Sequence, residues 1–164
     1  MTNKEFFVKT FSKEMEITAV AVRALPDDVQ DQNYKPDPKA KTAMEIIGHI
    51  IPHVGAMNEA AKSFVFNEEG KEFSNKEEAV EFLEKSTAGV LQDLKSVDDK
   101  TWEEKIVPFE YMGTKYFEAP MYEMYWMFLM DMIHHRGQLS TYYRPMGVRN
   151  PNLYGPTADD VQTG

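Results

Sequence analysis

The sequence predicts an all-α protein, more closely a four-helix bundle with a long crossover before the last helix. Apolar residues recur at spacings of three and four in four long stretches, the pattern of helices that each bury one face. Between the third and fourth stretches, over residues 98–119, β-type residues replace this pattern. The 164 residues suit one domain. We place the bundle at residues 1–147 and expect residues 148–164 to form a tail that packs partly on it.

The first two helices are predicted at residues 3–25 and from residue 40 to about residue 66. Their buried stripes are Phe7, Phe11, Met15, Thr18, Val22 and Leu25 in the first, and Met44, Ile47, Ile51 and Val54 in the second. A proline-containing loop over residues 30–38 separates the two helices. Pro52 lies within the second helix, where it removes a backbone hydrogen bond, so we expect a bend near Gly48.

A turn at residues 67–73 leads to the third helix, predicted from residue 75 to residue 97. Ser74 stands three residues before Glu77, the spacing of a capping box. Its inner face is Ala79, Phe82, Leu83, Ser86, Val90 and Leu94. Residues 98–119 are predicted to form a small β-hairpin or an ordered crossover, with an irregular loop held by Trp102 as the alternative. The last helix should begin at Pro120 and stop by Pro145.

Charge and composition exclude several classes of function. The net charge of −9 disfavours binding to duplex nucleic acid or to anionic membranes, because both repel an acidic surface. The chain has no cysteine, so only nitrogen and oxygen are available to bind a metal. No apolar run approaches the roughly 20 residues that cross a bilayer. The first residues also lack an apolar signal region, and we expect a cytoplasmic protein.

Polar residues interrupt the apolar last helix at its middle, where Asp131, His134 and His135 lie. Asp131 and His135 are four residues apart, so they share a helix face and could hold one ion between them. His134 points elsewhere, and we assign it a structural role with a hydrogen bond to a neighbouring helix or to the crossover. The open alternative is that one of these histidines is a hydrogen-bonded core residue and the other a surface residue.

The second helix adds His49 and His53 to the candidates. If the second and last helices are neighbours, His49 meets Asp131 and His135, and bundle cores commonly place metals between facing helices. His53 follows His49 by one turn and could be a fourth ligand, although a rim or surface position is the commoner case. Arg136 should point away from Asp131 and tie the last helix to the loops.

Three short motifs link the sequence to a known family. They are KTAMEIIGHI at residues 41–50, HHRGQLS at residues 134–140 and PNLYGP at residues 151–156. With these motifs, the chain resembles the DinB/YfiT-like superfamily of damage-inducible-type four-helix bundles. The motifs are spread over nearly the whole chain, and HHRGQL late in a helix is fairly specific.

The resemblance implies a divalent metal ion held by three histidines, one on the second helix and two on the last, four residues apart. His49 and His135 match two of them, and Asp131 stands where the third is expected. We favour Asp131 as an oxygen ligand, because an unpaired carboxylate is costly to bury in this apolar helix. The predicted ligands are therefore His49, Asp131 and His135, a set that suits zinc, nickel or iron. Two alternatives stay open, namely that Asp131 orients a histidine or that the site has been lost.

The resemblance also implies a function. Members of the superfamily include thiol-dependent transferases and isomerases, and a divalent ion lowers the pKa of a coordinated thiol or water. Our first hypothesis is a metal-dependent transferase or hydrolase-like enzyme that acts on a small molecule, with a low-molecular-weight thiol as a partner. The alternative is a non-catalytic dimeric module with a structural or vestigial metal site. We expect a homodimer, because the last helix is apolar nearly all round, and no nucleic-acid or membrane partner.

Overall fold

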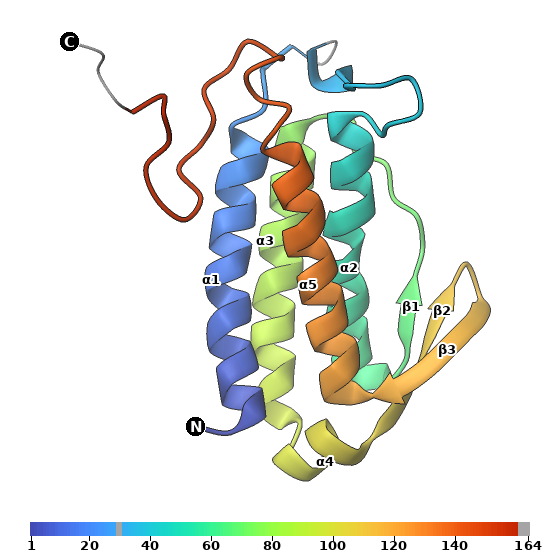
Figure 1. The fold of residues 1–164 in the computed structure, drawn as a ribbon. Helices are drawn as coiled ribbons and strands as arrows, with labels where there is room; N and C mark the ends of the chain where they lie inside the picture. The colour runs from blue at the N-terminus through green and yellow to red at the C-terminus, as the bar shows by residue number, and fades with distance from the viewer. Residues whose placement is uncertain (29–30, 161–164) are drawn as a thin grey trace.

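A computed structural model describes residues 1–28 and 31–160. Among these residues, four long helices lie side by side and a small sheet lies beside them (Figure 1). The long helices are α1 (Asn3–Arg23), α2 (Ala43–Ser63), α3 (Lys76–Asp93) and α5 (Met121–Leu139). Shorter elements are η1 (Asp31–Asn33), η2 (Leu94–Ser96) and α4 (Asp99–Glu104), and the strands are β1 (Phe66–Glu68), β2 (Ile106–Tyr111) and β3 (Thr114–Pro120).

The sheet corrects the all-α prediction, although helices dominate as expected. The antiparallel strands β2 and β3 form the predicted hairpin. The strand β1 was predicted as the end of the second helix and the start of a turn, and it instead pairs in parallel with β2, with Phe66 opposite Phe109. The reason is the burial of Phe66, whose ring stacks on Phe128 at 5.3 Å between centroids and meets Tyr125 at 4.8 Å. This aromatic contact draws the segment after α2 back onto α5.

The helix starts show how local sequence sets the boundaries. Thr42 and Glu45 form a capping box, so α2 begins at Ala43 rather than at residue 40. The helix then continues through Pro52 to Ser63. At α3 the cap is Asn75, whose side chain accepts a hydrogen bond from the Glu78 amide, so the predicted Ser74 and Glu77 box is wrong by one residue.

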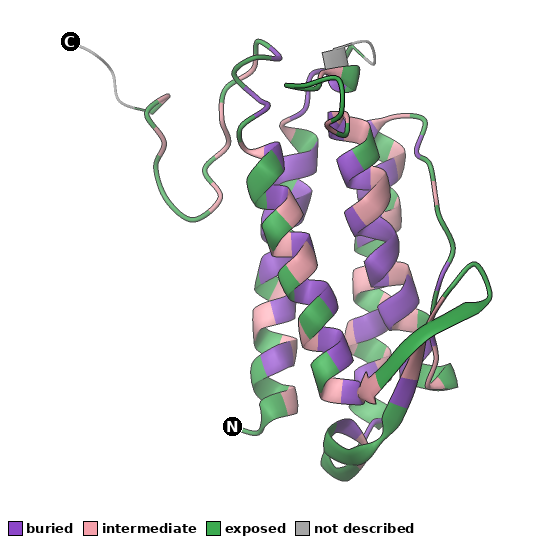
Figure 2. Ribbon diagram, turned by 45° about the vertical axis from the view of Figure 1, so that its right-hand side comes forward, coloured by how far each residue is buried: buried purple, intermediate pink, exposed green. Residues whose placement is uncertain are grey.

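The predicted stripes form the core. Figure 2 shows the buried residues on the faces that the long helices turn toward one another. All six residues of the first predicted stripe are buried, although Leu25 lies just beyond the end of α1. Ile47, Ile51 and Val54 of α2 are buried too, while Met44 is half-buried. Trp102 on α4 is fully buried, and its indole donates a hydrogen bond of 2.9 Å to Asn3. This contact pins the crossover between α3 and α5 as a helix and a hairpin rather than as an irregular loop.

Arg136 is buried against α1 and also bonds to Tyr154 of the tail, so it ties the last helix to the first helix as well as to a loop. Its guanidinium donates to the Glu14 carboxylate at 2.5 Å and to the hydroxyl of Thr18 at 2.8 Å. Tyr154 from the tail donates to the same Glu14 carboxylate at 2.6 Å and accepts from Arg136. The cluster therefore joins α1, α5 and the tail. Residues 161–164, at the end of the predicted tail, lie outside the described residues, and the division at residue 147 stays a prediction.

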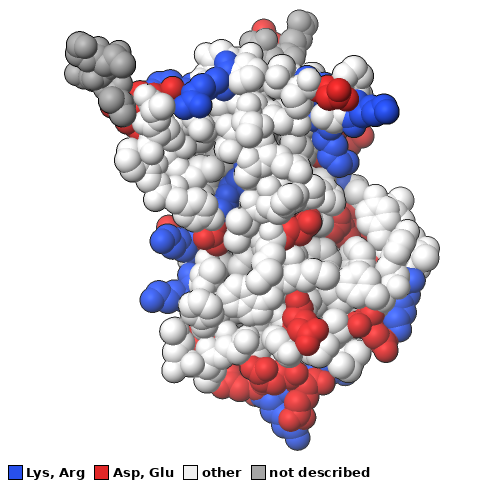
Figure 3. Space-filling model, viewed as in Figure 1, with Lys and Arg blue, Asp and Glu red and all other residues white. Residues whose placement is uncertain are grey.

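The surface agrees with the acidic composition. On the face shown in Figure 3, acidic side chains gather at the end that carries α4, while basic side chains stand near the edges. Within residues 1–28 and 31–160, no helix has the length and apolar character needed to cross a bilayer. The exclusion of nucleic acid as a partner stays a prediction.

Candidate metal centre

Two histidines of α2 face α5 at the middle of the molecule. His49 and His53 are one turn apart, and their ring centroids are 5.0 Å from one another. His49 is half-buried, whereas only 4% of His53 is exposed. The expectation of a rim or surface position for His53 is therefore wrong. Its ring is covered by Phe128 at 4.8 Å between centroids, a contact between distant segments that the sequence alone does not reveal.

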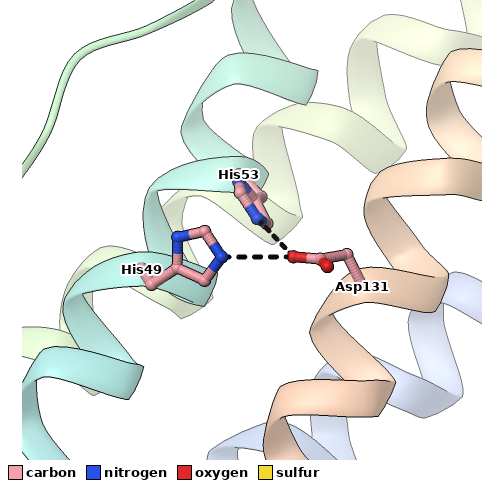
Figure 4. A group of neighbouring side chains, drawn as sticks. All are labelled: His49, His53 and Asp131. Atoms are coloured by element: carbon pink, nitrogen blue, oxygen red, sulfur yellow. Dashed lines mark hydrogen bonds and ion pairs between the residues drawn. The ribbon is translucent and has the colours of Figure 1, made fainter. Parts of the chain in front are cut away.

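Asp131 brings the opposing carboxylate from α5. Its Oδ2 atom lies 3.0 Å from His53 Nε2 and 3.4 Å from His49 Nε2 (Figure 4). The predicted meeting of His49 with Asp131 across two helices is thus found in the structure. Because 39% of the Asp131 side chain is exposed, the carboxylate is reached from solvent.

Glu68 holds the other side of His53. Its Oε2 atom lies 2.5 Å from His53 Nδ1, and both side chains are almost fully buried. Strand β1 positions Glu68, because Glu68 pairs with Tyr111 of β2 and its carbonyl accepts a hydrogen bond of 3.0 Å from the Met112 amide. A carboxylate on Nδ1 keeps the proton there and leaves Nε2 directed at the centre, as in metal sites where a carboxylate orients a ligating histidine.

The carboxylates and the burial shift the ionisation of the group. Burial alone lowers the pKa of His53, but the hydrogen bonds to Asp131 and Glu68 outweigh burial and raise this pKa above its ordinary value. The pKa of His49 is lowered by burial and by the neighbouring His53 and His135. The hydrogen bond from His53 holds the pKa of Asp131 below its usual range. The centre therefore keeps an anionic carboxylate between imidazoles.

His135 lies at the edge of this group. Its Nε2 atom is 3.5 Å from Oδ1 of Asp131, and its ring centroid is 4.7 Å from that of His49. The side-chain amide of Gln138 holds His135 Nδ1 at 2.8 Å. His134 is exposed, and its contact is with Gln138 on its own helix at 3.1 Å. The predicted bond from His134 to another element is therefore wrong.

The donor set fits a divalent cation. One ligand atom from each of His49, His53 and Asp131 can be chosen so that all three lie within 4.8 Å of one another. Ligands bonded to a tetrahedral zinc at about 2.0–2.1 Å lie about 3.3 Å apart. The separations of 3.0 and 3.4 Å between Asp131 and the two imidazoles are close to that spacing. The three atoms can thus converge on one ion with small side-chain movements.

An open pocket of about 900 Å³ adjoins the centre. His49, His53 and Glu68 are among its lining residues, together with residues of the 70–73 segment and the hairpin tip. Gly48 allows this arrangement, because a Cβ there would lie 3.1 Å from the backbone oxygen of Lys71. The pocket is within the volume range of small-molecule sites.

Comparisons with known proteins agree with this architecture. The family model described as the DinB family matches residues 1–163. A crystal structure of a DinB-like protein from Bacillus cereus has a TM-score of 0.71 at 19% identity, covering 92% of this chain and 97% of that chain. A DinB-like protein from Bacillus subtilis has a TM-score of 0.67 at 15% identity, covering 92% and 99%. No curated protein matches the chain.

Proposed function

Because the chain belongs to the DinB family, we propose that it binds a divalent metal ion through His49, His53 and Asp131 and acts on a small molecule in the adjoining pocket. We also infer that α1, α2, α3 and α5 form the four-helix bundle of that family. His135, which the sequence singled out as a ligand, is assigned to the Oδ1 side of Asp131, where it steadies the carboxylate.

The observation that carries the proposal is the convergence of imidazole Nε2 atoms on one carboxylate. His49, His53 and His135 all place Nε2 within 3.5 Å of an Asp131 oxygen. Acceptor atoms hold Nδ1 of His53 and of His135 from outside the cluster. A core histidine that serves packing alone needs only one polar partner, whereas a ligand needs one nitrogen fixed and the other free.

The residues present support a thiol-dependent transferase or a hydrolase-like enzyme as the reaction class. A divalent ion lowers the pKa of a coordinated thiol or water and so supplies a nucleophile at neutral pH. Three protein ligands leave room for that group, as catalytic sites require. Glu68 keeps His53 in the tautomer that binds the ion, and the exposed edge of Asp131 leaves the centre accessible.

Zinc titration of alanine variants tests the ligand assignment. We expect His53→Ala to weaken zinc binding at least about a hundredfold, and His135→Ala to weaken it less, because His135 contacts only the far oxygen of Asp131. His134→Ala is the matched control. His134 is exposed, and its side chain forms a hydrogen bond with Gln138 of the same helix. Competition calorimetry against a chelator, with the fold checked by circular dichroism, gives the affinities.

Equal zinc affinity in wild type and His53→Ala would contradict the assignment. Absence of stoichiometric zinc, nickel or iron in the wild type would favour the non-catalytic dimeric module instead.

That alternative has its own structural support, because Met127 and Met130 on α5 are 41% and 60% exposed and offer an apolar face to a second copy. The homodimer remains a proposal that size-exclusion chromatography tests.

Zinc binding should also depend on pH in a defined direction. Carboxylate hydrogen bonds raise the pKa of His53, so metal-free protein keeps a proton there to a higher pH than an unperturbed histidine does. The pKa of His49 is lowered, so His49 is already neutral. We therefore expect affinity to rise with pH up to the pKa of His53, with release of no more than one proton per ion. Calorimetry in buffers of different ionisation enthalpy measures this number, and release of two protons would contradict the assigned charge states.

A further inference from the structure

The tip of the β2–β3 hairpin has a backbone conformation that its residues do not favour. Met112 and Gly113 form a two-residue loop, and both have positive φ angles, 51° and 74°. Such loops normally carry Asn, Asp or Gly at the first position, because a larger side chain is strained there. Met112 nevertheless occupies that position, with 66% of the residue exposed.

A hydrogen bond and a close approach join this strained tip to the segment that supports the metal centre. The Met112 amide donates a hydrogen bond of 3.0 Å to the carbonyl of Glu68, the residue whose carboxylate holds His53. The hydroxyl of Tyr111 lies 3.4 Å from where a Cβ on Gly70 would be, so the ring reaches across to the segment after β1. The tip is thereby joined to the strand that positions the centre.

The pocket against the centre has an apolar wall to which this tip contributes Met112. Met112 and Tyr111 line it together with Phe109, Phe73 and Met44. The charged lining residues are Lys41, Lys71, Glu45, Glu68 and Glu72, and the Glu68 carboxylate is bonded to His53. The Glu45 carboxylate is moreover engaged in capping α2. Two of these three carboxylates are therefore already engaged within the protein, and the apolar residues are the part of the wall free to select a substrate by contact.

From this arrangement, we propose that Met112 determines the specificity of the metal centre, and that the substrate carries an apolar group of about phenyl size beside its metal-binding atoms. This inference rests on the proposed metal-dependent function and adds the class of substrate to it. A flexible thioether adapts to the faces of aromatic groups, which explains why methionine occupies a turn position that asparagine would fill with less strain. The hairpin is then the recognition element of the site.

Two hydroxamates that differ only in the apolar group provide the test. Acetohydroxamate and benzohydroxamate share the metal-binding atoms, so their affinity ratio reports on the pocket wall. We expect zinc-loaded wild type to bind benzohydroxamate at least about tenfold more tightly than acetohydroxamate in calorimetric titrations. Met112→Asn should reduce this ratio at least about threefold without loss of zinc, because asparagine suits the turn and removes the apolar contact of Met112.

Two further variants keep the result interpretable. Met112→Leu retains an apolar side chain and should preserve the preference. Met130→Asn removes a methionine of similar exposure from α5 that does not line the pocket, and should leave the ratio unchanged. Equal affinity for the two hydroxamates, no binding of either to zinc-loaded protein, or an unchanged ratio in Met112→Asn would overturn the inference while leaving the metal site in place. Failure of wild type to bind zinc, seen in the preceding titration, would overturn the proposed function and this inference with it.

Discussion

Replacing Arg136 by methionine is expected to lower the free energy of unfolding by about 3–5 kcal/mol, because it leaves the carboxylate of Glu14 buried without its cation. The Arg136 side chain is 2% exposed and that of Glu14 is 9% exposed. The variant also deprives Thr18 and Tyr154 of a hydrogen-bond partner. For a chain of this length the melting temperature should fall by roughly 6–20 °C. Urea denaturation monitored by circular dichroism measures the free energy.

Two controls separate a buried ion pair from a general effect of losing an arginine. Arg23→Met breaks an ion pair with Glu84 in which both side chains are more than half exposed, and should cost less than about 1 kcal/mol. The double variant Glu14→Leu/Arg136→Met should recover much of the lost stability, because the buried charge is then gone as well. A loss of less than about 1 kcal/mol in Arg136→Met would show that the cluster does not stabilise the fold.

Replacing Asp131 by asparagine is expected to weaken zinc binding at least about a hundredfold, because the only carboxylate among the proposed ligands is removed. The side chain keeps its size and can still accept hydrogen bonds from His53 and His49. The unfolding free energy of the metal-free protein should therefore change far less than in Arg136→Met. Competition calorimetry with a chelator and urea denaturation measure the two effects on one preparation.

Asp99→Asn serves as the matched control for this variant. Asp99 lies on α4, at the far end of the helices from the centre (Figure 1), and its side chain is 55% exposed. It should bind zinc as wild type does. If Asp131→Asn kept wild-type affinity, the carboxylate would be a hydrogen-bond partner of the histidines rather than a ligand.

The sequence predicted the helices well because their signal is local. Phe7, Phe11 and Met15 repeat with the period of a helix, and burying one face of each long helix leaves few ways to pack them. The same reasoning predicted the contact between His49 and Asp131, since this contact required only that the second and last helices be neighbours. Departures at the helix ends were small and followed from which of two adjacent polar residues caps the helix, as at Asn75.

The parts of the centre that depend on contacts between distant segments could not be predicted from the sequence. Glu68 lies in a stretch without periodicity, and only the parallel pairing of β1 with β2 brings it to His53. His53 was placed at a rim because nothing near it in the sequence predicts the ring of Phe128 above it. Arg136 likewise finds Glu14 on the first helix, a contact between residues far apart in the chain. Each case is a tertiary contact between two segments, and the local pattern of neither segment predicts the contact.

Anomalous diffraction at the zinc absorption edge, from crystals grown with zinc, locates the ion and its ligands. We expect a strong anomalous peak bounded by His49 Nε2, His53 Nε2 and an oxygen of Asp131. No peak at this position in protein that has taken up zinc, or a peak bound by other side chains in its place, would contradict the ligand assignment.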